Sequence, residues 1–418
     1  MTSLEAPPEA LRAIPPGGRH LQPGQAGSAV APALGRAPRF PQFHRRHTLL
    51  TLASLGAWSI ARNTAWASTK GLPIHLAAAW EREGSFHIGL LSTQLGAGQP
   101  LHIHASLEIP TRAHGLFVLP DGSVLATARR PGDWLVRWWP GQRAEPQWLW
   151  QDGERSFNGH VLASADGGHL FTTETDVETG ASWIGVRDAR TLQKIAEWPT
   201  HGIDAHELTW DTRTTHHGAP TLIVANGGVP TAPETGRVKR DLPTMDSSIV
   251  RLDGHTGRLL GQWRLQDKRL SLRHLAWSPD ARTLGIALQA EHDDTTAKDA
   301  APVLALFDGT ALQVVPTPEH IAQSIHGYGG SMAATPAGWA VSCPRANGIA
   351  TYTPQGEWRG LVPLPDVCPL AVHGGALWAG GLGTSLQNAQ AAAPVSHAHG
   401  RSLRGVRLDN HWVLASGT

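Results

Sequence analysis

The sequence predicts an all-β protein, a seven-bladed β-propeller with four-stranded antiparallel blades. The first observation is composition: 46 glycines and 31 prolines in 418 residues, which punctuate short strands and are poor in helix interiors. The second is a hairpin, in which two short apolar strands flank an Asp-Gly or Pro-Asp turn. The third is that this hairpin recurs about every 40 to 68 residues, and in three of the units a second hairpin follows the first, as in propeller blades.

The repeats set the blade boundaries. Clear copies begin at His114, His160 and His274, a copy with a longer turn begins at His206, and a weaker one begins at Leu76. With further copies near residues 330 and 369, the count is seven. We expect either the N-terminal strand or the C-terminal one, at residues 405–414, to close the ring. Three tryptophans recur late in their units, where we expect packing between blades: Trp198, Trp263 and Trp358.

Composition also excludes some classes of protein. Hydrophobic residues make up 41% of the chain and charged residues 17%, which is enough apolar material for a packed core and argues against disorder. The formal net charge is +1, whereas a nucleic-acid-binding protein usually has a basic excess. We therefore expect no nucleic-acid partner.

The N-terminal region has the layout of an export signal. Residues 1–43 are rich in Pro, Gly and Ala, and we interpret them as disordered or as lying upstream of the true start. Residues 44–67 contain the pair Arg45-Arg46, an apolar run over 48–61, and the small-residue site Ala65-Trp66-Ala67, as in a twin-arginine signal peptide. The run is shorter than the roughly 20 residues that span a bilayer. We expect a periplasmic propeller over residues 68–418 with no membrane span.

Four histidines are the strongest candidates for chemistry. His114, His160 and His206 follow one another at intervals of 46 residues, and His274 occupies the same place one longer repeat later. The first strand of a blade lines the central channel, so these side chains should converge on the axis. Imidazole is a good ligand for Fe, Cu or Zn. The alternative is structural: a repeated histidine can also hold blades together through hydrogen bonds.

Other polar residues are candidates for supporting or ligand-binding roles. They are Glu174, Asp176, Glu207, Asn226, Arg237, Arg273 and Asp366. Arg237 belongs to a long polar insertion in the fourth unit, of the kind that often forms a lid or contact surface. The two cysteines, Cys343 and Cys368, are compatible with one disulfide or with two buried thiols. The sequence contains no His-Glu-x-x-His, Gly-x-Ser-x-Gly or Cys-x-x-Cys motif, so no named catalytic arrangement is supported.

Several motifs resemble an exported bacterial β-propeller family catalogued as domain of unknown function 1513, over roughly residues 70 to 415. They are His201-Gly-Ile-Asp-Ala-His-Glu-Leu, Val224-Ala-Asn-Gly-Gly, Gly236-Arg-Val-Lys, Thr244-Met, Leu270-Ser-Leu-Arg-His-Leu-Ala, Gly327-Tyr-Gly-Gly-Ser, Asp366-Val-Cys, Thr172-Thr-Glu-Thr-Asp and Glu178-Thr-Gly. The resemblance implies a periplasmic protein found with an imelysin-type iron-uptake protein and a di-haem oxidoreductase. The chain departs from the family pattern at Val161, Thr175 and Pro369.

The function we favour from the sequence is a non-enzymatic accessory propeller, a monomer that binds a metal or a metal-bearing partner. The resemblance places it in iron acquisition or periplasmic redox handling. One alternative is an enzyme: a lactonase-like hydrolase with a metal at Glu174, Asn226 and Asp366, or a subunit like the propeller of amine dehydrogenases. This alternative rests on fold analogy. The other alternative is an interaction scaffold whose histidines are structural.

Overall fold

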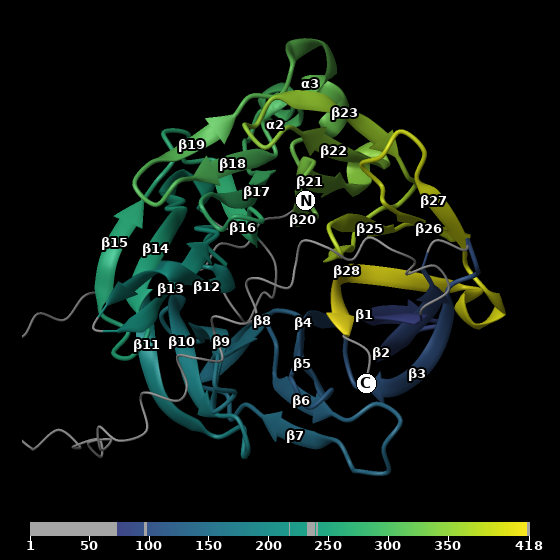
Figure 1. The fold of residues 1–418 in the computed structure, drawn as a ribbon. Helices are drawn as coiled ribbons and strands as arrows, with labels where there is room; N and C mark the ends of the chain where they lie inside the picture. Colours follow the sequence, from purple (N-terminus) through teal and green to yellow (C-terminus); the bar gives the residue numbers. More distant parts are fainter. Residues whose placement is uncertain (1–72, 96–97, 217, 232–238, 240, 416–418) are drawn as a thin grey trace, which may run out of the picture. The chain divides into compact units, whose positions relative to one another are not determined.

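The computed structural model describes residues 73–95, 98–216, 218–231, 239 and 241–415. The predicted export segment and Arg237 lie outside these residues. The described residues belong to one compact unit, which spans Trp66–Thr418. They form seven four-stranded antiparallel sheets arranged in a ring around a common axis (Figure 1), so the predicted seven-bladed propeller is confirmed.

Each blade consists of four neighbouring strands, named from the channel outward. Blade 1 contains β28 (Val406–Ala415), β1 (Pro73–Arg82), β2 (Ser85–Gln94) and β3 (His102–Ile109). Blade 2 contains β4 (Ala113–Val118), β5 (Val124–Ala128), β6 (Trp134–Trp138) and β7 (Gln147–Trp150). Blade 3 contains β8 (Arg155–Ala163), β9 (His169–Asp176), β10 (Ala181–Asp188) and β11 (Lys194–Ile203). Blade 4 contains β12 (Ala205–His216), β13 (Ala219–Asn226), β14 (Ser248–Asp253) and β15 (Leu259–Trp263).

The remaining three blades follow the same order. Blade 5 contains β16 (Leu270–Trp277), β17 (Leu284–Ala290), β18 (Leu304–Phe307) and β19 (Leu312–Val315). Blade 6 contains β20 (Ser331–Thr335), β21 (Gly338–Cys343), β22 (Gly348–Tyr352) and β23 (Trp358–Pro363). Blade 7 contains β24 (Leu370–His373), β25 (Ala376–Gly380), β26 (Thr384–Gln387) and β27 (Val395–Ala398). Short helical segments lie in the connections: η2 (Leu242–Thr244), α2 (Thr295–Ala300), α3 (Glu319–Ile325), η3 (Pro344–Ala346) and η4 (Arg401–Leu403).

The ring closes through the C-terminal strand. β28 pairs antiparallel with β1, and Leu76 lies opposite Leu414. Each innermost strand also contacts the innermost strands of both neighbouring blades, in a cycle that runs through β28, β4, β8, β12, β16, β20 and β24. The strand at Leu76 is therefore the second strand of its blade, and the first-strand position predicted for that segment is wrong. The C-terminal strand supplies the missing inner position.

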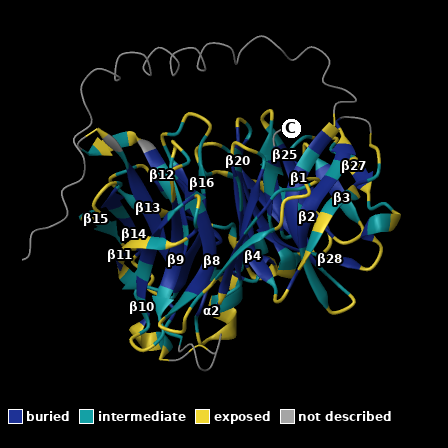
Figure 2. Ribbon diagram, turned by 90° about the horizontal axis from the view of Figure 1, so that it is seen from below, coloured by how far each residue is buried: buried dark blue, intermediate teal, exposed yellow. Residues whose placement is uncertain are grey.

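Apolar clusters between adjacent blades hold the ring together. Trp198 on β11 packs with Leu208 and Leu222 of the next blade. Trp263 on β15 packs against Phe307 of blade 5, with ring centroids 4.7 Å apart. Trp358 on β23 packs against a cluster shared by blades 5 and 6. The predicted packing role of the three tryptophans is confirmed, and Figure 2 shows the buried residues concentrated in the strands, with exposed residues at the turns.

Aspartates fix many of the turns between strands. Asp176, Asp188 and Asp253 each accept a hydrogen bond from the backbone N–H three residues further on, at 2.8 Å. This side-chain-to-backbone bond reproduces a backbone turn and is the physical reason that Asp is favoured there. Among the described residues, none of the helices is long and apolar enough to cross a membrane.

Candidate metal centre

Five histidines lie on the innermost strands of five consecutive blades. They are His411 on β28, His114 on β4, His160 on β8, His206 on β12 and His274 on β16. In each of these strands the pairing register with the second strand shifts across the histidine. A β-bulge of this kind bends the strand and redirects a side chain. The innermost strands of the other two blades, β20 and β24, keep a continuous register.

The bulges bring the imidazole rings together in the channel. Ring centroids lie 4.8 Å apart for His114 and His160, 4.9 Å for His160 and His206, 4.7 Å for His206 and His274, and 4.6 Å for His274 and His411. The ring closes between His411 and His114 at 4.8 Å. The convergence predicted for the four histidines from their spacing is therefore present, with a fifth member.

Two glycines make this close approach possible. A Cβ atom at Gly115 would meet the backbone oxygen of Gly159 at 2.2 Å, so β4 and β8 could not come this near with a larger residue there. Gly159 has φ of +106°, and a Cβ there would lie 2.7 Å from the His114 ring. Only glycine readily combines that backbone conformation with so close a neighbour.

Several ring nitrogens in the cluster have no hydrogen-bond partner. His114, His160, His206 and His274 are between 2% and 6% exposed, whereas His411 is partly buried. The unpartnered buried atoms are His114 Nδ1, His160 Nε2, His206 Nδ1 and His411 Nε2. Leaving a buried polar atom unsatisfied costs about 1–3 kcal/mol. The fold therefore maintains an arrangement that a ligand in the channel would stabilise.

Burial lowers the pKa of all five imidazoles below the ordinary histidine value. For His114 and His206, the charges of neighbouring histidines lower the pKa further. The pKa of His274 falls to about 3, first through burial and then through the charges of Arg273 and Arg129. Burial also lowers the pKa of His160 and His411. The five rings are neutral at pH 7, which is the form in which imidazole binds a metal.

Glu207 is the carboxylate that the structure joins to the cluster. Its Oε2 accepts a hydrogen bond from the Leu275 backbone N–H at 3.0 Å and lies 3.2 Å from Nδ1 of His274. Burial raises the pKa of this carboxyl group. A carboxylate that orients a histidine through its second ring nitrogen is a common arrangement behind metal ligands, so the predicted supporting position of Glu207 fits the geometry.

Arginines flank the histidine cluster on one side. Arg273 is 2% exposed and its Nη1 lies 2.9 Å from Oδ2 of Asp204, which also pairs with Arg130. Burial lowers the pKa of Arg273 to about 10, so it is a cation at neutral pH. A small cavity with a volume of about 20 Å³ lies between the histidines and these arginines. Its lining consists of His114, Arg129, Arg130, His206, Arg273, His274, Gln289, Tyr328 and Asn410.

Glu174 and Asp176 occupy other positions. Glu174 is fully buried inside blade 3, where its Oε1 lies 2.6 Å from Arg187 and its Oε2 lies 3.0 Å from Lys194. Asp176 pairs with Arg155 and caps the turn that contains Thr179. Neither carboxylate belongs to the groups of described residues whose ligand atoms converge closely enough to hold a metal.

Asn226, Asp366 and the cysteines also lie apart from the histidines. Asn226 is buried at the end of β13, and its Nδ2 donates to the Thr200 carbonyl at 3.0 Å. Asp366 is exposed and lines a surface groove near β28. Glu174, Asn226 and Asp366, the trio expected for a lactonase-like enzyme, are absent from the groups of described residues whose ligand atoms lie close enough together to bind one metal ion. Cys343 and Cys368 are free thiols, the first buried and the second partly buried, so the alternative of two unpaired thiols describes the structure except for the full burial of Cys368.

His411 is the member of the cluster that the repeat pattern does not predict, because the pattern places the start of its blade at Leu76. The inner strand of that blade, β28, is the last described strand and pairs with β1, the first, so that Leu414 lies opposite Leu76. The sequence signal for this fifth member is the histidine in Asn410-His411-Trp412, within the segment expected to close the ring. Assigning that segment the inner position would have placed His411 in register with the other four.

The fold and site together define a class: a seven-bladed β-propeller with a buried imidazole cluster in its channel. The chain belongs to the family described as "Protein of unknown function (DUF1513)", whose match covers residues 107–415. No curated protein matches the chain. Similar solved structures include a chain of the nidogen/laminin complex at 13% identity, covering 70% of this chain and 94% of that one, with a TM-score of 0.42. Saccharomyces cerevisiae Sqt1 is 12% identical, and the match covers 78% of this chain and 84% of that one, with a TM-score of 0.48. The Dos1 propeller is 9% identical, and the match covers 78% of this chain and 83% of that one, with a TM-score of 0.47.

Proposed function

We propose that this protein binds one divalent transition-metal ion on the channel histidines. The observation that supports this most is the separation of 3.4 Å between Nε2 of His114 and Nε2 of His206. Around an ion with metal–nitrogen bonds of about 2.0–2.1 Å, two ligands of a tetrahedron are separated by roughly 3.3–3.4 Å. The two ring nitrogens therefore already stand at the spacing of a ligand pair.

Further ligands are within reach of that pair. The ligand atoms of His114, His160 and His206 all lie within 4.8 Å of one another, and so do those of His114, His274 and His411. Nδ1 of His274 faces Glu207, which leaves Nε2 as the metal-facing atom of that ring. The proposed centre uses His114, His160, His206 and His274, with His411 as a fifth imidazole beside them.

The ligand chemistry narrows the choice of metal. A set made of neutral imidazoles suits Zn, Cu, Fe or Ni and is poor for Mg or Ca, which prefer oxygen. Iron, copper and zinc are therefore the ions to test first. The small cavity beside the rings has room for about one water molecule, and a bridging water among structural histidines is the competing explanation.

We also propose a cellular setting. The arginine pair and small-residue site at residues 44–67 support export to the periplasm in a folded state. The family resemblance supports an imelysin-type iron-uptake protein or a di-haem oxidoreductase as partner, and a role in iron acquisition or periplasmic redox handling. The protein would then act as a metal-binding accessory rather than as an enzyme.

The test is metal stoichiometry in matched variants. The purified full chain is stripped with a chelator, reloaded separately with Fe(II), Cu(II) or Zn(II), freed of excess metal and measured by elemental analysis. We expect about one ion per chain for at least one metal, and loss of that ion in His114→Gln and His206→Gln. The exposed His320 on α3 provides the control, and His320→Gln should keep the ion. Retention below a tenth of an ion for all three metals would refute the proposal.

A further inference from the structure

Beside the histidine cluster, the described residues bring together more cations than carboxylates. Arg112 and Arg129 both approach Asp409. Arg112 Nη2 donates a hydrogen bond to Asp409 Oδ1 at 2.8 Å, and Arg129 Nη1 lies 3.8 Å from the same oxygen. Arg130 and Arg273 share the other carboxylate, Asp204. Among the described residues, four guanidinium groups thus lie against two carboxylates, whose side chains are both less than 6% exposed.

The other nearby acids do not remove this excess. Glu291 is itself paired with Lys239 and lies 3.9 Å from Lys298. Glu207 is held by the Leu275 amide and the His274 ring. Three of these cations, Arg129, Arg130 and Arg273, line the channel cavity.

Arg273 provides a second, independent indication of a ligand. It is 2% exposed, and its Nε has no hydrogen-bond partner although the side chain lines the cavity. A buried guanidinium normally uses its donors in charge-assisted hydrogen bonds, most effectively to carboxylate or phosphate. A donor left unpaired beside a cavity fits an acceptor that comes from outside the chain.

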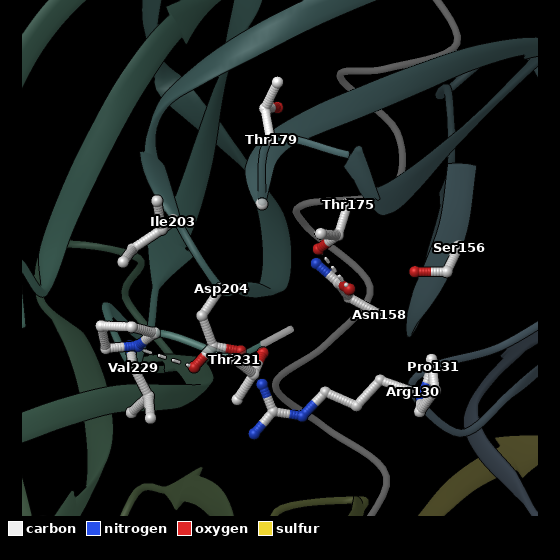
Figure 3. Close-up of a pocket in the computed structure, with 12 residues that line it drawn as sticks. Arg130, Pro131, Ser156, Asn158, Thr175, Thr179, Ile203, Asp204, Val229 and Thr231 are labelled. Carbon is white, nitrogen blue, oxygen red and sulfur yellow. Dashed lines mark hydrogen bonds and ion pairs between the residues drawn. The ribbon is translucent and has the colours of Figure 1, made fainter. Parts of the chain in front are cut away.

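A second, larger cavity gives such a ligand room. Its volume is about 130 Å³, which is enough for several non-hydrogen atoms of a ligand. Arg130 lines both this cavity and the histidine-lined cavity. In Figure 3 the Arg130 guanidinium extends toward Asp204, with Thr231 close by and the Asn158 and Thr175 side chains on the neighbouring wall. Ser156 also lines this cavity.

We propose that this arginine-lined region is a binding site for a small oxyanion, a carboxylate or a phosphate, which enters through the cavity beside Ser156 and Asn158. Arg130 and Arg273 hold its oxygens, and the hydroxyl and amide groups of the larger cavity contact the rest of the molecule. The anion also offsets the repulsion that the same guanidinium groups exert on a metal ion at the histidines. Only this last effect depends on the proposed metal site.

The test uses the metal-free full chain, so that it does not depend on metal binding. Citrate, inorganic phosphate and chloride are titrated by calorimetry at constant ionic strength. We expect saturable one-to-one binding of citrate or phosphate and no binding of chloride. Tighter binding of citrate indicates a carboxylate ligand, and tighter binding of phosphate indicates a phosphate ligand. Arg130→Gln should weaken that binding about tenfold or more, because it removes a charge-assisted contact.

Two further variants make the result decisive. Arg130→Gln leaves Asp204 with Arg273 as a balanced pair, so we expect it to fold. Ser156→Leu narrows the larger cavity without changing charge and should also weaken citrate binding, whereas the exposed Arg404→Gln should not. Absence of saturable binding, or binding that Arg130→Gln and Ser156→Leu both leave unchanged, would overturn the proposal. If the reloaded protein retains metal but the metal-free chain binds no anion, the anion site alone is refuted. If the chain binds the anion but retains no metal, the metal centre alone is refuted.

Discussion

Mild acid should destabilise the metal-free propeller because the channel histidines must stay neutral in the folded state. An unfolded histidine has a pKa near about 6.5, whereas that of His274 in the fold is about 3 and those of the other four are also lowered. The unfolded chain therefore binds more protons below pH 6.5. The stabilising contribution is complete above that pH and is lost as the pH falls.

The size of the effect follows from the lowered pKa values. At pH 5.5, one unit below the pKa of an unfolded histidine, each histidine that stays neutral in the fold lowers the unfolding free energy by about 1.4 kcal/mol relative to its value at pH 7.5. Five such groups give an upper value of about 7 kcal/mol, comparable with the roughly 5–15 kcal/mol that stabilises a typical domain. The raised pKa of Glu207 acts in the opposite direction, because the folded state then binds a proton more readily.

Urea unfolding of the chelator-treated protein at pH 7.5, 6.5 and 5.5, followed by tryptophan fluorescence, measures this loss. His114→Gln should reduce the difference between pH 7.5 and pH 5.5 by about 1.4 kcal/mol, whereas His320→Gln should leave it unchanged. This pH range lies above the titration of unfolded carboxyl groups, so their contribution is small. An unfolding free energy that does not change between pH 7.5 and 5.5 would refute the reasoning.

Three further predictions concern a buried ion pair of blade 3, the two thiols and a glycine beside the histidine cluster. Glu174→Gln should lower the unfolding free energy by about 3–5 kcal/mol, because Arg187 is left buried without its carboxylate; metal content should not change, and loss of metal in the folded variant would contradict the ion-pair assignment. Cys343 and Cys368 should resist alkylation at pH 8 until the protein unfolds, since burial raises the pKa of both thiols to about 12; rapid native-state labelling by iodoacetamide would contradict this. Gly159→Ala should reduce metal retention, because its Cβ would meet an imidazole of the cluster at 2.7 Å; unchanged retention by elemental analysis would show that β4 and β8 can separate without cost.

The sequence was sufficient for the architecture because the hairpin repeats are local. Blade number and inter-blade packing of Trp198 and Trp263 follow from turn chemistry and spacing alone. The convergence of His114, His160 and His206 also follows, since equal intervals place them at equivalent points of neighbouring blades. The bulges that aim these side chains inward depend on pairing between strands and have no clear sequence pattern of their own.

The surroundings of the cluster required three-dimensional information. Glu174 lies near His160 in sequence terms, but strand pairing directs it against Gly185, where a Cβ would lie 2.0 Å from Oε1, and beside Arg187. Arg129 and Arg130 follow β5, the second strand of blade 2, and they form no recognisable motif, because arginines are ordinary on loops. Their importance arises from Asp204 and Asp409, which lie far from them in the chain.

The most direct test of the metal centre is X-ray absorption at the metal edge of the reloaded full chain. We predict a shell of nitrogen neighbours at about 2.0–2.1 Å with the outer-shell scattering of imidazole, for about one ion per chain. In His206→Gln that imidazole contribution should fall or the metal should be lost, while His320→Gln should match the parent. A purely oxygen shell without imidazole scattering, or a spectrum that His206→Gln leaves unchanged, would contradict metal binding by the channel histidines.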